Sequence, residues 1–95
     1  MEVEEKSKID RRLARIEGQI RGIRKMLDEG QYCMDVLSQI SAARSALNRA
    51  GAELVTSHVK SCVIGHQSSL AHAKSAGMTT EELIEELRAN ISRLL

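Results

Sequence analysis

Cys33, His58 and Cys62 are the residues of this chain whose types and spacing favour metal chemistry. Thiolate sulfur and imidazole nitrogen are soft or borderline metal ligands. His58 and Cys62 are spaced i, i+4, so on a helix they lie on one face and can bind one ion together. A lone cysteine on an apolar helix face is usually a small core residue, so the inference depends on all three residues.

Cys33 is too far from the other two ligands to join them within one helix. It lies 29 residues before Cys62, which is roughly 43 Å along a helix. A second chain running antiparallel would bring its Cys33 to the first chain's His58 and Cys62. The spacing therefore predicts a metal site at a subunit interface, and a two-fold axis near Leu47 would create two identical sites.

Three helices should position these residues. Apolar residues recur at three- and four-residue spacing over about 6–29, 32–75 and 79–94. Gly30 is suited to end the first helix, and Thr79 with Glu82 has the capping-box spacing that begins the third. With one Tyr and no Phe or Trp, the core must come from long aliphatic seams shared between chains. We expect one all-α domain, residues 1–95, forming an antiparallel four-helix-bundle dimer.

Charge is distributed unevenly along the 95 residues. The net charge is only +1, but residues 6–25 contain eight Lys or Arg against two acidic residues, which is compatible with a nucleic-acid partner. No stretch approaches the ~20 apolar residues of a membrane span, and the start of the chain has no apolar signal core. We expect a cytoplasmic protein whose cysteines are thiols or ligands. No catalytic motif is present, so an enzyme is not expected.

Two stretches carry a family resemblance: EGQIRGIRKMLDEGQYCMDVLSQISAARSALNRA (residues 17–50) and SHVKSC (residues 57–62). They resemble the copper-sensitive operon repressors, the CsoR-type branch of a family of small all-helical bacterial regulators. The resemblance implies a disc-shaped dimer of dimers without a helix-turn-helix. It implies that Cys33 of one chain and His58 and Cys62 of another bind Cu(I) in a trigonal site. It also implies that the apo-tetramer represses by binding operator DNA, and that Cu(I) releases the DNA and permits expression of copper-export genes.

The ligand set favours the copper branch of this family. Nickel- and cobalt-sensing members add a histidine near the N-terminus, and residues 1–10 contain none. The formaldehyde-sensing branch lacks the last cysteine, and the persulfide-sensing branch lacks the intervening histidine; Cys62 and His58 are both present here. His66, four residues after Cys62, could extend the chelate, but we interpret it and His72 as solvent-facing.

The resemblance also assigns roles to residues around the metal ligands. The family's DNA-contacting residues match Arg12 and Arg49, while Arg15, Arg21 and Lys25 are plausible phosphate contacts on charge alone. The residues that orient the ligands match Tyr32 and a glutamate of the third helix. That glutamate is Glu82 in one alignment and Glu86 in another.

Two other functions are compatible with the residues. Cys33 and Cys62 could form a disulfide or polysulfide between protomers in a persulfide sensor of the same fold, although His58 argues against this. A metal buffer or chaperone without a DNA role is the alternative from another class, and the basic first helix argues against it. Zn(II) could use the same three ligands with water as a fourth.

Overall fold

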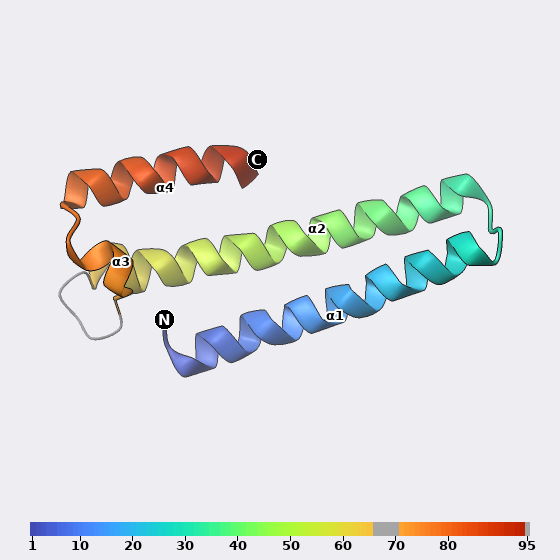
Figure 1. The fold of residues 1–95 in the computed structure, drawn as a ribbon, viewed down its shortest axis with the longest axis horizontal. Helices are drawn as coiled ribbons and strands as arrows, with labels where there is room; N and C mark the ends of the chain where they lie inside the picture. Colours follow the sequence, from blue (N-terminus) through green and yellow to red (C-terminus); the bar gives the residue numbers. More distant parts are fainter. Residues whose placement is uncertain (66–70, 95) are drawn as a thin grey trace.

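The computed structural model describes residues 1–65 and 71–94. All regular structure in those residues is helical, in the order α1 (Val3–Asp28), α2 (Cys33–His58), η1 (Val59–Ile64), α3 (Ala73–Ala76) and α4 (Thr80–Leu94). α1 and α2 form a long antiparallel hairpin, and α4 runs back along the C-terminal half of α2 (Figure 1). The expected all-helical fold is therefore confirmed for the described residues. The assembly of two chains into a four-helix bundle, and of dimers into a tetramer, stays a prediction.

The turn between the first two helices is built as the sequence predicts. Gly30 has a φ of 68°, a left-handed conformation that glycine adopts without steric cost. Its N–H donates to the Leu27 carbonyl at 3.1 Å, and the Gln31 N–H donates to the Met26 carbonyl at 3.0 Å. This pair of bonds is a Schellman motif, which satisfies the last carbonyls of α1 and directs the chain back into α2.

α2 presents two different rows of side chains along its length. One row, spaced by seven residues, is buried and small: Val36, Ala43, Ala50 and Ser57. It packs against α1, whose buried residues are Ile9 and Ile16. The other row carries the large side chains, each about half exposed: Leu37, Ile40, Leu47 and Leu54. The hairpin thus has its core in the small row and leaves the large row for another surface to cover.

The expectation of one continuous helix over 32–75 is wrong. The α-helix ends at His58, continues as the π-helix η1, and stops at Gly65, a residue of low helix propensity. His66 lies outside the described residues. The His72 N–H donates to the Cys62 sulfur at 3.5 Å. An unbroken helix would carry His72 about 15 Å from Cys62, so the break allows a tertiary contact that helical periodicity does not reveal.

α4 begins and docks in the way its sequence indicates. The Thr79 N–H donates to the Glu82 carboxylate at 3.0 Å, and the Glu82 N–H donates to the Thr79 hydroxyl at 3.2 Å, which is the predicted capping box. Leu83 is completely buried. At the other end, Leu94 packs so closely on Gly51 of α2 that an added Cβ would lie 2.9 Å from its Cδ1 atom.

A broad apolar surface remains uncovered in the single chain. The molecule measures 53 × 26 × 15 Å, which is little more than one helix thick. Besides the large row of α2, the exposed apolar residues on α1 include Leu13, Ile20 and Leu27. Apolar patches of this kind on a small protein mark interaction surfaces. No helix among the described residues is both long and apolar enough to cross a membrane.

Candidate metal centre and DNA-binding surface

His58 and Cys62 meet at the end of α2. His58 is the last residue of α2 and Cys62 lies one turn later in η1. Both line one open cleft of about 800 Å³ between η1, α3, α4 and the end of α2. Apolar and polar side chains share its walls, among them Leu54, Leu87, Met78, His72 and Glu86. π-Helical turns are rare and often occur at functional sites.

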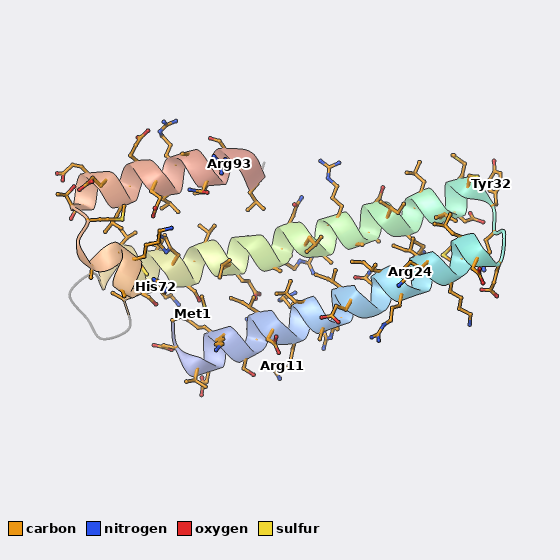
Figure 2. The ribbon with its side chains drawn as sticks, in the orientation of Figure 1. Met1, Arg11, Arg24, Tyr32, His72 and Arg93 are labelled. Atoms are coloured by element: carbon orange, nitrogen blue, oxygen red, sulfur yellow. The ribbon has the colours of Figure 1, made fainter. Side chains whose placement is uncertain are left out.

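Cys33 lies at the opposite end of the same helix. It is the exposed first residue of α2, roughly 38 Å from His58 along the helix. Tyr32, the residue before Cys33, is labelled at one end of the molecule in Figure 2, and His72, which lines the cleft, is labelled at the other end. Among the residues that the structure describes, no three His, Cys, Asp or Glu side chains form a group that could hold a metal ion. One chain brings two of the three expected ligands together, and only a second chain could add Cys33.

The two residues expected to orient the ligands have different surroundings. Tyr32 precedes α2 at its N-cap, is 69% exposed, and makes no capping hydrogen bond with its side chain. Glu82 is committed to the capping box, and the Thr79 N–H and hydroxyl lower the pKa of its carboxyl group. Glu86, rather than Glu82, lines the cleft with His58. Glu82 is therefore a poor choice, because the capping bonds of α4 hold its carboxylate away from the cleft.

A polar contact joins the start of α1 to the C-terminal end of α2, where the expected ligands His58 and Cys62 lie. The buried Ser57 hydroxyl donates to Glu5 Oε2 at 2.6 Å, and Lys60 Nζ lies 3.5 Å from Glu5 Oε1. The Ser57 hydrogen bond is the main reason why the pKa of Glu5 lies below its ordinary value, and the charge of Lys60 adds to it. Because Ser57 directly precedes His58, this contact ties α1 to the segment that carries both ligands.

Arg12, the expected DNA contact of α1, is held by a carboxylate within the chain. Arg12 Nη2 lies 2.8 Å from Glu53 Oε1, and Lys8 Nζ lies 3.7 Å from the same oxygen. The Arg12 side chain is 32% exposed. In the described part of the chain its Nε atom and Glu53 Oε2 are both buried without a hydrogen-bond partner. Glu53 therefore orients Arg12 and offsets part of the positive charge of α1.

The other expected DNA contacts are exposed. Arg15, Arg21 and Lys25 lie along α1, and Arg49 lies on α2. Figure 2 shows two further cations, Arg11 and Arg24, spread along α1. Exposed Lys and Arg side chains along one helix are free to contact DNA phosphates. These positions are compatible with DNA binding, and their roles stay predictions.

The donor set fits a soft metal ion. Two thiols and one imidazole suit Cu(I), whereas hard ions such as Mg²⁺ need oxygen ligands. His58 and Cys62, two of these expected donors, line one cleft from successive turns.

The sequence and fold match known metal sensors. Residues 5–93 match the family model described as metal-sensitive transcriptional repressor. The chain belongs to this family. It is 41% identical over 81 residues to the copper-sensing transcriptional repressor RicR of Mycobacterium tuberculosis, covering 77% of this chain and 84% of that protein.

Two solved structures of similar proteins share the fold. The copper-sensing repressor CsoR with Cu(I) from Geobacillus thermodenitrificans has a TM-score of 0.78 and 38% identity, covering 98% of this chain and 88% of that one. The nickel-responsive transcriptional regulator InrS has a TM-score of 0.68 and 32% identity, covering 94% and 91%. The protein is thus a metal-sensing transcriptional repressor, a class of non-enzymatic regulators. Because copper and nickel sensors share this fold, the metal must be argued from the ligands.

Sequence reasoning missed several residues of this region. It did not find the contacts of Glu5 with Ser57, of Glu53 with Arg12, or of the His72 backbone with Cys62. The charge patterns of α1 and α2 gave a weak signal only for the pair of Glu53 and Arg12, because Ser57 carries no charge. The contact of the His72 backbone with Cys62 has no sequence signal, because almost every residue type has a backbone N–H.

Proposed function

We propose that this protein is a Cu(I)-responsive repressor, whose apo form binds operator DNA and whose copper-bound form releases it. The observation that carries the proposal is the pairing of His58 and Cys62 in one cleft with Cys33 exposed at the far end of α2. Two thiols and one imidazole are a soft donor set without the further nitrogen ligands that nickel prefers. Similarity to two copper-sensing repressors supports the same conclusion.

The exposed row of α2 supplies the surface on which two chains would meet. Leu37, Ile40, Leu47 and Leu54 lie on it, and covering them with the same row of a second, antiparallel chain would bury large apolar side chains. In that arrangement Cys33 of the partner subunit approaches His58 and Cys62. Cu(I) supplies a soft Lewis acid that bonds to sulfur and nitrogen atoms from two chains and so joins them.

The link to DNA runs through α1. Glu5 holds Ser57 and Lys60 at the metal-binding end, and Glu53 holds Arg12. A shift of His58 and Cys62 toward the partner subunit moves the residues that carry these contacts, and so changes how α1 presents its cations. Coupling of the two sites requires only that copper affinity differ between the DNA-bound and free arrangements.

An anaerobic fluorescence-anisotropy titration tests this function. The reduced protein is bound to its own upstream DNA, and Cu(I), Zn(II), Ni(II) and a persulfide donor are added in turn. We expect release by Cu(I) near one ion per protomer. Release by persulfide alone would instead assign the protein to thiol sensing, and release by nickel alone would assign it to nickel sensing. Failure to bind any DNA would contradict a repressor and leave a metal-buffering role.

His58→Ala tests whether the imidazole transmits the signal. Two thiols can still hold Cu(I), so we expect copper binding to weaken less than its coupling to DNA release. His72→Ala is the matched control, because it removes an exposed imidazole that lines the same cleft and is not among the expected ligands. If copper releases DNA from the His58 variant as fully as from the unaltered protein, the proposed role of His58 is wrong.

A further inference from the structure

Cys62 is covered in a way that Cys33 is not. Cys62 is 6% exposed, whereas Cys33 is exposed at the start of α2. The His72 backbone N–H lies 3.5 Å from the Cys62 sulfur, which is hydrogen-bond distance for a sulfur acceptor. The two residues are ten positions apart, so this bond fastens the segment after the helix break to the expected ligand.

His72 itself is fixed by three further hydrogen bonds. Its Nδ1 atom accepts from the Lys74 N–H at 3.0 Å. Its carbonyl accepts from the Ser75 N–H at 3.0 Å and from the Ser75 hydroxyl at 2.8 Å. Ser75 is 5% exposed, so these bonds anchor α3 to the interior. The bonds of His72 with Lys74 and Ser75 thus hold in place the N–H that faces Cys62.

We propose that the His72 backbone N–H positions the Cys62 sulfur for Cu(I), and that the burial held in place by α3 slows the reaction of this sulfur with alkylating reagents such as iodoacetamide. A sulfur that accepts one fixed hydrogen bond has fewer orientations, and hydrogen bonds to ligands are a common means of tuning metal sites. The cleft of about 800 Å³ that Cys62 lines has room for an ion and for small molecules. Protection of the sulfur therefore depends on the burial of Cys62, which is 6% exposed, and not on the size of the cleft. The test by Cu(I) affinity rests on the proposed function, whereas the test by cysteine alkylation does not.

A pair of variants at one position isolates the N–H. His72 has φ −67° and ψ 143°, which proline adopts without strain. His72→Pro removes the N–H together with the imidazole, whereas His72→Ala removes the imidazole and keeps the N–H. The difference between the two variants therefore reports the loss of the backbone N–H together with the restriction that proline places on the preceding Ala71.

Two measurements are made on the reduced, full-length protein. The first is the rate of iodoacetamide alkylation at each cysteine of the apo protein, followed by peptide mass spectrometry. We expect Cys62 to react about tenfold more slowly than Cys33. We expect His72→Pro, but not His72→Ala, to remove most of that difference. The second is Cu(I) affinity by chelator competition, where we expect His72→Pro to lose about tenfold relative to His72→Ala.

Equal alkylation of both cysteines in the unaltered protein would overturn the shielding, and equal copper affinity of the two variants would overturn the positioning. If His72→Pro loses helical circular dichroism, hydrogen exchange of the His72 amide in the unaltered protein decides instead. Protection supports the bond, and exchange at the rate of a free amide overturns it. Failure of the unaltered protein to bind Cu(I) would refute the proposed function, while alkylation and exchange would still test the covering segment.

Discussion

Leu83→Ala should separate α4 from the rest of the molecule. Leu83 is 0% exposed and is the fully buried large side chain of the described residues. Truncating such a leucine removes its transfer free energy and leaves a cavity, so we expect a loss of about 3 kcal/mol within the usual range of 2–5. For a domain of this length that corresponds to a fall in Tm of roughly 12–24 °C. Ile84, the next residue, is 53% exposed, so Ile84→Ala should cost about 1 kcal/mol or less.

Urea unfolding followed by circular dichroism would compare the two variants at several protein concentrations. The concentration series is needed because association stabilises the folded chain by mass action. If Leu83→Ala and Ile84→Ala lower the free energy of unfolding equally at every concentration, the docking of α4 by Leu83 is wrong. A loss confined to Ile84→Ala at high concentration would mean that Ile84 lies in a subunit interface.

The loss of α4 should also weaken copper binding. α4 contributes Glu86, Leu87 and Asn90 to the cleft that His58 and Cys62 line. We expect Leu83→Ala to lower Cu(I) affinity, measured by chelator competition, at temperatures where α1 and α2 are still folded. Unchanged affinity would show that this wall of the cleft has no part in ligation.

Three further perturbations test other parts of the structure. The pKa of Glu5 is lowered chiefly by the Ser57 hydroxyl. The ionised Glu5 carboxylate therefore stabilises the fold at pH values above its ordinary pKa, and this stabilisation is lost as the pH falls through its lower pKa in the folded state. The stability of Glu5→Gln, measured by acid unfolding, should depend less on pH in that acidic range. Gly30→Ala should cost about 1 kcal/mol in urea unfolding, because its φ of 68° is strained for an L side chain. Glu53→Gln should tighten DNA binding at low salt and steepen its log–log salt dependence by about 1, because Arg12 is no longer neutralised.

Each of these has a control within the chain. Glu2→Gln replaces an exposed acid close to Glu5, and equal acid profiles for the two variants would contradict the assigned pKa shift. Gly18→Ala places a Cβ in open space within a helix, so it should stabilise by roughly 1 kcal/mol; a similar gain from Gly30→Ala would contradict the strain. Weaker or unchanged DNA binding by Glu53→Gln would show that Glu53 orients Arg12 more than it offsets charge.

Local features of the sequence determined the ends of several helices. Gly30 and the capping box of Thr79 with Glu82 act through bonds within a few residues, so their types and spacing were sufficient. The same holds for the helical character of α1 and α4, whose apolar stripes set the period. The pairing of His58 with Cys62 also followed from spacing, because successive helical turns place them on one face.

The tertiary structure decided what lies across from these elements. Helical periodicity continues past His58, and nothing local indicates the change to a π-helix or the return of the chain to Cys62. The three- and four-residue spacing of apolar residues predicted a helix here, but it did not indicate which of these residues α1 covers. The close packing of α1 selects the small row, with Ala43 and Ala50.

The choice between Glu82 and Glu86 shows the same division. Both glutamates lie on α4, and sequence alignment alone could not separate them. The capping bonds remove Glu82 from consideration, and the docking of α4 brings Glu86 to the cleft. Local hydrogen bonding fixed the start of the helix, which any capping box would do in isolation. Only the packing of α4 against α2 and η1 decided which carboxylate lines the cleft with the expected ligands His58 and Cys62, because proximity across the fold depends on contacts that no single segment contains.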